Sequence, residues 1–335
     1  MNIQIAAIAY HLPTNIVSNV DLQQTNPDWE MERLAQKTGV YNRHRAADNE
    51  TAYDLALKAC EKLFEGNEVL KQSIDGIIFC TQSPDYIMPS NAFLLHKSLN
   101  FKQSVFAFDY NLACSGFIYG VTIARGFIAT SLAKNILLVT ADTYSKYIHP
   151  ADRSASILFG DGAAATLISA QQTEGIIDVI LASSGKDFDS FYIPAGGCRL
   201  PKSDNTAIAE IDTSGNTHTP ENIYMNGFGV WKFIASVVPK QINELLNRNN
   251  FSVDDIDLFI FHQASKMTLD SLMKTLKLNN EKVFINIGNV GNLVSASIPV
   301  AIKDAEASGK LKRGDLILLS GFGVGLSWGT IIMRY

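Results

Sequence analysis

Short runs of apolar residues alternate along this chain with segments in which apolar residues recur every three or four positions. The runs are typical of buried strands, and the recurring spacing is typical of helices with one buried face. Residues 52–64 and 267–276 show the helical spacing. This alternation predicts an α/β protein. The predicted strands cover residues 3–9, 76–81, 105–108, 135–140, 163–168, 176–181, 258–261, 283–287, 316–320 and 329–333.

The second part of this pattern resembles the first at an offset of about 180 residues. Residues 73–80 (SIDGIIFC) resemble residues 255–262 (DIDLFIFH), and residues 135–140 resemble residues 315–320. We interpret the similarity as a diverged duplication. The alternative is that any two strand–helix units share such features.

The duplication predicts an N-terminal half over residues 1–172 and a C-terminal half over residues 173–335. A polar segment near 184–222, rich in Ser, Gly, Asp, Asn and Pro, is predicted to be an insertion in the second half. Long loops of this kind often cover active sites, although some are only disordered.

Composition narrows the class of protein. The chain has 335 residues, of which 47% are hydrophobic and 18% charged, so it can bury a large core and is not disordered or fibrous. The net charge of −5 argues against nonspecific binding to nucleic acid or to anionic membranes. No signal peptide or membrane-spanning run is visible. No CxxC pair and no metal-ligand spacing occurs among the cysteines, which predicts no metal site and a reducing cytoplasm; they are Cys60, Cys80, Cys114 and Cys198.

Cys114 is the first candidate for chemistry. It precedes a segment, residues 116–130, that is apolar on nearly every face and is therefore predicted to be a central helix. The start of a helix favours a thiolate, because the helix dipole and free N–H groups face it. The alternative is a small core cysteine, which is the more common fate of a free thiol.

Three further segments contain candidate groups at predicted strand ends or turns. His262 follows the strand 258–261, where ligands bind in open α/β sheets, although a lone histidine there is more often structural. Asn292 follows Gly291 and could donate into a cavity or cap the next helix. Residues 321–325 (GFGVG) would let backbone N–H groups approach a ligand, but no Lys-Ser/Thr pair follows, which excludes a nucleotide P-loop.

Together these segments resemble the condensing enzymes of the thiolase superfamily, and in particular β-ketoacyl-acyl-carrier-protein synthase III, over essentially the whole chain. Each motif is weak alone, and the set in this order is specific. The motifs are residues 111–117 (NLACSGF), 152–162 (DRSASILFGDG), 262–264 (HQA), 291–292 with 297–299, and 322–325 with 328–329.

The resemblance implies a thiolase-like fold of duplicated βαβαβαββ halves in a five-layered αβαβα core. It also implies a Cys-His-Asn triad at Cys114, His262 and Asn292. Cys114 would take an acyl group from a thioester, and decarboxylation of malonyl-acyl-carrier-protein would then drive a Claisen condensation. Backbone N–H groups of Cys114, Val324 and Gly325 would form the oxyanion hole.

The resemblance further implies residues that bind substrates and carrier protein. Substrate contacts would come from Lys37, Arg153, Met88, Phe228 and Ser265. Of these, Arg153 matches an arginine that contacts adenine, and Met88 matches a residue that reaches across a dimer. Carrier docking would use Lys232 and Lys266. A solvated charge, or for Met88 ordinary packing, is the alternative at these positions.

Several positions depart from the family pattern at the entrance tunnel. Phe228 and Ser265 replace asparagines, Met267 replaces a docking arginine, and Trp29 is out of register with an adenine-stacking tryptophan. The chemistry is thus expected to be retained and the tunnel altered.

The resemblance implies a homodimer that acts on acyl-CoA or acyl-carrier-protein and on malonyl-acyl-carrier-protein. It implies no metal or organic cofactor. The alternatives are an acyltransferase on the same fold that acylates an amine or alcohol in a specialised pathway, or a noncatalytic partner subunit.

Overall fold

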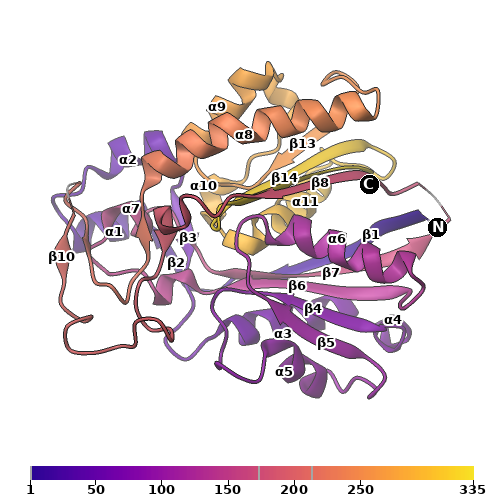
Figure 1. Cartoon of the computed structure of the whole chain (residues 1–335), viewed down its shortest axis with the longest axis horizontal. Helices are drawn as coiled ribbons and strands as arrows, with labels where there is room; N and C mark the ends of the chain where they lie inside the picture. Colours follow the sequence, from indigo (N-terminus) through magenta and orange to yellow (C-terminus); the bar gives the residue numbers. More distant parts are fainter. Residues whose placement is uncertain (1, 173, 213) are drawn as a thin grey trace.

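The computed structural model describes residues 2–172, 174–212 and 214–335, and the first of its two large sheets lies in the N-terminal part of the chain (Figure 1). In this sheet β4 pairs in parallel with β5 and β6, and β7 lies antiparallel between β6 and β1. The strand order is β1 (Asn2–His11), β7 (Gly162–Gln171), β6 (Asn135–Asp142), β4 (Gly76–Cys80) and β5 (Phe106–Tyr110).

The second sheet repeats this pattern of parallel and antiparallel pairs. Strand β14 pairs in parallel with β13, and β15 lies antiparallel between β14 and β8. An isolated parallel bridge from Val283 to Phe259 stands beyond β13, where β5 stands beyond β4. The order is β13 (Leu258–Phe261), β14 (Leu316–Gly323), β15 (Ser327–Arg334) and β8 (Ile176–Ser183).

Helices cover both sheets and fill the space between them (Figure 1). The outer helices on the first sheet are α3 (Ala52–Phe64) and α5 (Asn91–Ser98), and those on the second are α8 (Gly227–Arg248) and α9 (Lys266–Leu276). Between the sheets lie α6 (Gly116–Ala129) and α11 (Ser297–Ala307). This arrangement confirms the expected five-layered αβαβα core, and it explains why the strand segments are apolar runs, since both sheet faces are covered.

The remaining elements are short and lie in the connections. They are β2 (Ile16–Ser18), α1 (Asn19–Thr25), α2 (Met31–Thr38), β3 (Asn42–His44), α4 (Glu68–Gln72), η1 (Tyr144–Lys146), α7 (Arg153–Ser156), η2 (Phe188–Ser190), β9 (Phe191–Tyr192), β10 (Glu210–Ile211), β11 (Thr217–His218), β12 (Tyr224–Met225), η3 (Asn280–Lys282), α10 (Ile287–Val290) and η4 (Val294–Ala296).

The polar segment near 184–222 contains only short elements, among them η2 and the hairpin of β10 and β11. The predicted boundary between the two halves falls at residue 173, which lies outside the described residues, so the duplication stays a prediction. Among the described residues, no helix combines the length and hydrophobicity that crossing a membrane requires.

The prediction of a strand over residues 283–287 is wrong. Val283 makes a single bridge, and the Phe284 N–H donates to the Phe259 carbonyl over 3.1 Å. Ile285 is 44% exposed, and the chain then turns at Asn286 and enters α10. A short apolar run in the sequence predicts a strand, but it does not show whether a neighbouring strand will pair with it.

The central helix α6 approaches the first sheet closely at a glycine. A Cβ atom on Gly120 would lie 2.3 Å from the Tyr110 hydroxyl and 2.5 Å from Leu138 Cδ1. The Tyr110 hydroxyl in turn donates to the Gly116 carbonyl over 2.7 Å. Gly126, one and a half turns further along the helix, has no neighbouring atom within 4 Å of an added Cβ. Gly120 therefore faces the sheet, whereas Gly126 lies on the exposed side of the helix.

This difference predicts opposite effects of the same substitution within one helix. Gly120→Ala should lower the unfolding free energy by about 1–3 kcal/mol, because the methyl group overpacks the helix–sheet contact. Gly126→Ala should leave it unchanged or raise it by up to about 1 kcal/mol, because alanine favours helix. The midpoints of urea denaturation of both variants measure the effect. Equal midpoints would contradict the packing described here.

Candidate active site

The three predicted catalytic side chains line one cavity of about 550 Å³. Cys114 comes from the loop between β5 and α6, His262 from the end of β13, and Asn292 from the loop after α10. All three are buried, with exposed fractions of 4%, 1% and 3%. Cys114 and Asn292 are 178 positions apart in the sequence, as the difference between 292 and 114 gives, and they line the same cavity.

The loop that carries Cys114 is held against the glycine-rich loop of the second sheet. A Cβ atom on Gly323 would lie 2.7 Å from Cys114 Cβ and 2.9 Å from its sulfur. A Cβ on Gly321 would lie 2.8 Å from the Cys114 carbonyl oxygen. Any larger residue would displace the thiol, so these glycines serve close approach of two backbones.

A pair of hydroxyls joins the same two loops. The hydroxyls of Ser115 and Ser327 are 2.7 Å apart, and the Ser327 hydroxyl donates to the Val324 carbonyl over 2.8 Å. This bond fixes the orientation of the Val324 carbonyl beside Cys114. The backbone N–H groups of Cys114 and Val324 both act on the thiol, where they favour its charged form.

Burial nevertheless raises the pKa of the Cys114 thiol well above its usual range, and the negative charge of Asp142 adds to the effect. The two N–H groups oppose this shift without overcoming it. The thiolate expected from the helix start is thus wrong for the resting site. Helix α6 begins two residues later, at Gly116, and loss of water from around the sulfur outweighs the nearby dipoles.

His262 is a neutral imidazole with unused polar atoms. Its backbone N–H donates to the Ser320 carbonyl over 2.8 Å, which fixes the residue to the end of β14. Within the described part of the chain neither ring nitrogen has a hydrogen-bond partner, and the Phe322 ring packs edge-on against the imidazole at 5.8 Å. Burial lowers its pKa to about 3. Buried polar groups are normally paired, so these nitrogens are placed for a ligand in the cavity.

Asn292 makes one side-chain hydrogen bond within its own turn. Its Oδ1 accepts from the Val294 N–H over 2.9 Å, as a turn asparagine does. Its backbone is fixed on both sides, since its N–H donates to Leu158 and its carbonyl accepts from Gly160. The carboxamide oxygen is thereby oriented, and the NH₂ group donates to no acceptor among the described residues. It remains available to a ligand in the cavity.

Asp142, which sequence reasoning missed, connects the Asn292 loop to the first sheet. This fully buried residue ends β6, and its carboxylate accepts from the Gln82 N–H over 2.8 Å. It also accepts from the Ser295 hydroxyl over 2.5 Å and from the Ser295 N–H over 3.3 Å. Burial raises its pKa to about 7 against these hydrogen bonds. The only signal in the sequence was an acidic residue that ends an apolar strand.

The predicted substrate and docking residues divide into two groups. Lys37, Arg153, Phe228 and Ser265 line the cavity, although the Ser265 hydroxyl also caps α9 by accepting from the Thr268 N–H. The others, together with the predicted oxyanion residues Val324 and Gly325, do not line it: Met88, Lys232 and Lys266.

These outer residues lie on the surface. Met88 is 80% exposed, and Lys232 is exposed on α8. The Lys266 ammonium pairs with the Asp270 carboxylate one helical turn along α9, at 2.5 Å. Phe228, at the cavity, is also 72% exposed and packs beside Trp231 with ring centroids 5.9 Å apart.

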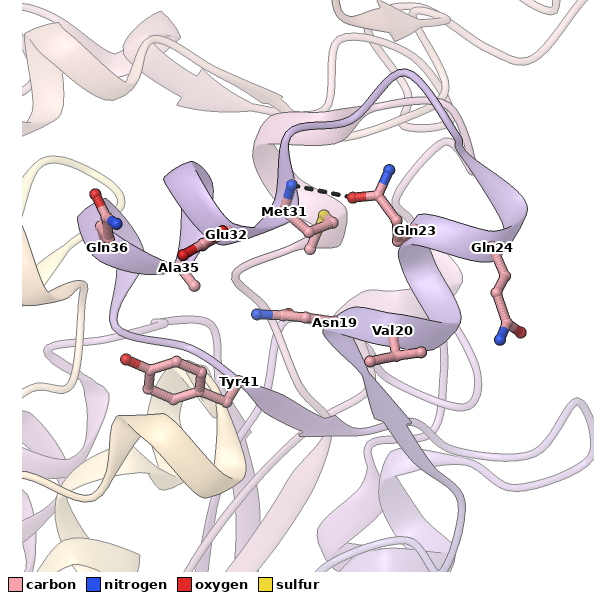
Figure 2. Close-up of a pocket in the computed structure, with 9 residues that line it drawn as sticks. All are labelled: Asn19, Val20, Gln23, Gln24, Met31, Glu32, Ala35, Gln36 and Tyr41. Carbon is pink, nitrogen blue, oxygen red and sulfur yellow. Dashed lines mark hydrogen bonds between the residues drawn. The ribbon is translucent and has the colours of Figure 1, made fainter.

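A second cavity, of about 670 Å³, lies between α1 and α2 and contains none of the predicted residues. Figure 2 shows Met31 and Asn19 on either side of it, with Tyr41 at one end. The Gln23 side chain accepts from the Met31 N–H over 3.2 Å and joins the two helices. Its lining has no cysteine and no histidine, so it contains no counterpart of the Cys114–His262 pair.

Two family models match segments of this chain. Residues 108–185 match the family model described as 3-Oxoacyl-[acyl-carrier-protein (ACP)] synthase III. Residues 246–335 match the model described as the C terminal part of the same family. The first segment contains Cys114, and the second contains His262 and Asn292.

Full-length relatives and solved structures extend the match to the whole chain. A β-ketoacyl-[acyl-carrier-protein] synthase III of Clostridioides difficile strain 630 is 36% identical over 334 residues, which cover 99% of this chain and 98% of the relative. A crystal structure of a 3-oxoacyl-(acyl-carrier-protein) synthase III has a TM-score of 0.97 at 40% identity and covers 100% of both chains. The corresponding synthase of Burkholderia xenovorans LB400 has a TM-score of 0.92 at 32% identity, over 100% of this chain and 94% of that chain. The chain therefore belongs to the β-ketoacyl-[acyl-carrier-protein] synthase III family of acyl-transferring, condensing enzymes with the thiolase-like fold.

Proposed function

We propose that this chain transfers an acyl group from a thioester to Cys114 and condenses it with malonyl-acyl-carrier-protein, giving a β-ketoacyl thioester. The observation that carries the proposal is a single cavity lined by a buried thiol, a buried neutral imidazole with both ring nitrogens unpaired, and the buried Asn292 carboxamide. These are the groups needed to hold an acyl chain and to stabilise an enolate without adding a permanent charge.

In the first step the Cys114 sulfur attacks the acyl carbonyl, and the bond from that carbon to the donor's sulfur breaks. The proton of the Cys114 thiol ends on the departing thiol, so no net charge is created. Because burial raises the pKa of the thiol, its deprotonation has to accompany the attack. The N–H groups of Cys114 and Val324, with that of Gly325, are proposed to meet the oxyanion of this step.

In the second step the malonyl thioester loses CO₂, and the electron pair of the broken carbon–carbon bond becomes an enolate. His262 and Asn292 are proposed to donate to the thioester oxygen that carries this charge. The enolate carbon then attacks the acyl carbonyl, the bond to the Cys114 sulfur breaks, and the released thiolate takes up one proton from water. A neutral imidazole can serve this role through its N–H, because a hydrogen bond to the thioester oxygen strengthens as negative charge develops on that oxygen. Simple transfer to an amine or alcohol would not use the Asn292 amide.

The proposed partners are the acyl thioester and the carrier protein, and both approach the cavity from its outer side. The thioester is proposed to enter past Lys37 and Arg153, and the acidic carrier protein to dock on Lys232 and Lys266. No metal or organic cofactor takes part in these steps. The free thiol at Cys114 fits a reducing cytoplasm.

A homodimer is proposed through the free edge of the first sheet. Within one chain β5 ends that sheet, and its residues are only half-buried. The neighbouring residues Ile87 and Met88 are 97% and 80% exposed, and Phe93 on α5 is 53% exposed. An unpaired edge beside exposed large apolar side chains favours association. In such a dimer Met88 would reach the partner's cavity.

Loading of Cys114 tests the proposed reaction. The intact protein is incubated with acyl-CoA or acyl-carrier-protein, and its mass is measured. We expect one acyl group on the unaltered chain and none on Cys114→Ala. Cys198→Ala should load normally, because that exposed thiol lies outside the cavity.

The same assay separates the two steps. His262→Ala and Asn292→Ala should still load but release CO₂ from malonyl-carrier protein roughly 10²–10³-fold more slowly, since each removes one enolate donor. Normal CO₂ release by both variants would contradict the proposal that His262 and Asn292 stabilise the enolate of the condensation. Acylation of the Cys114→Ala variant would contradict the proposal that Cys114 is the nucleophile.

The neutral imidazole predicts a dependence of stability on pH. The pKa of His262 is lowered from 6.5 to about 3, so between these values the unfolded chain binds more protons and the unfolding free energy falls as the pH drops. The contribution of His262 should be about 2 kcal/mol smaller at pH 5 than at pH 7. Denaturation at both values should show a correspondingly smaller loss for His262→Gln. Identical pH dependence would contradict a buried neutral ring.

The proposed interface predicts that Ile87→Asp converts the dimer to monomer at micromolar concentration, because a charge would be buried there. Val69→Asp is the matched control, since Val69 is 82% exposed and lies on α4, at the opposite end of β4. Sedimentation equilibrium measures both. A dimer that is unaffected by Ile87→Asp would place the interface elsewhere.

A further inference from the structure

The hairpin of β10 and β11 forms part of the wall of the active-site cavity. Three residues from its turn line the cavity that also holds Cys114, namely Asp212, Ser214 and Asn216. The hairpin belongs to the polar segment near 184–222 and lies at the same end of the molecule as α2 and α7 (Figure 1). These helices carry Lys37 and Arg153, which line the same cavity. The insertion is thus a wall of the entrance and not a remote loop.

The hairpin engages the arginine that the family resemblance connects with adenine. The Arg153 Nη2 donates to the Ser214 carbonyl over 3.1 Å. The guanidinium therefore has a protein acceptor before any substrate enters. A nucleotide that used Arg153 would have to replace this bond or share the guanidinium with it.

Asp212 places a negative charge beside these cations. Its Oδ1 accepts from the N–H groups of Ser214 and Asn216 over 2.8 and 2.9 Å, and its Oδ2 accepts from the Asn216 amide over 3.2 Å. Burial raises the pKa of this carboxyl, but the hydrogen bonds outweigh burial and the net shift is downward, helped by the charge of His218. Among the described residues no lysine or arginine is within ion-pair distance of it. The charge at the entrance is therefore not neutralised by a direct partner.

We propose that this hairpin is a specificity determinant for the acyl donor, in which the Asp212 carboxylate and the Ser214 carbonyl oppose the nucleotide phosphates of coenzyme A. Coenzyme A brings a pyrophosphate and a ribose phosphate to the entrance, whereas a carrier-bound pantetheine arm brings one phosphodiester. The site thus favours donors without the nucleotide. The inference rests on the proposed function, because it names the donor class for acylation of Cys114.

Asp212→Asn tests the proposal by removing the charge alone. The asparagine Oδ1 can still accept from the Ser214 and Asn216 N–H groups, so the turn is retained. The kcat/KM for acylation of Cys114 is measured with an acyl-CoA and with the acyl-pantetheine of the same chain, which carries no phosphate. We expect the ratio of the CoA value to the pantetheine value to rise roughly three- to tenfold, since like-charge repulsion at the entrance is removed.

Asp204→Asn is the matched control, because Asp204 is exposed in the same insertion and does not line the cavity. Its ratio should equal that of the unaltered chain. If both thioesters acylate Cys114 and the Asp212→Asn ratio does not rise above that of the control, the hairpin proposal is overturned and the proposed function stands. If neither thioester acylates the unaltered chain, the proposed function fails, and the donor preference fails with it.

Discussion

The close contact between the Cys114 loop and the glycine-rich loop is the constraint on which the rest of the site depends. The thiol sits on a loop of the first sheet, and only glycine fits at position 323 at the end of β14, because a Cβ atom there would lie 2.9 Å from the sulfur. The paired hydroxyls of Ser115 and Ser327 hold the same contact from the side. Because β14 also fixes His262 through the Ser320 carbonyl, this one junction sets the nucleophile, the imidazole and the proposed oxyanion hole relative to one another. Neither sheet contains a complete site without the other.

Burial then sets the protonation states in this junction. Loss of water raises the pKa of Cys114 and Asp142 and lowers that of His262, so the thiol and the imidazole are both neutral at rest. A neutral thiol and a neutral imidazole interact weakly with a neutral thioester and more strongly with the oxyanion or enolate that forms from it. The hydrogen bonds from Ser295 to Asp142 serve this arrangement indirectly, since they anchor the loop that orients Asn292.

The residues at the cavity entrance differ in their role from those that surround the reacting atoms. Deep in the cavity the residues match the family motifs, whereas toward the surface Phe228 and Met267 depart from the pattern that the resemblance implies, and the β10–β11 hairpin forms part of the wall. Such a division is expected physically. The reacting atoms are the same for every acyl thioester, but the carrier of the thioester differs in size and charge, and only the outer wall contacts it. A change in this wall alters donor choice without disturbing the junction beneath.

The sequence by itself determined the class of fold and the central apolar helix, because apolar periodicity is a local property, and its short motifs predicted Cys114, His262 and Asn292 as the thiol, imidazole and amide of the site. It misplaced the strand at 283–287, since pairing depends on a partner strand, and it placed a thiolate at Cys114, since a helix start is visible in the sequence but desolvation is not. Asp142 and the role of the polar insertion were also hidden. Both depend on contacts between segments 61 to 153 positions apart, as the Arg153–Ser214 and Asp142–Ser295 bonds show. Burial, and hence the charge state of each group in the site, is a property of those contacts and is decided only when the two sheets close on each other.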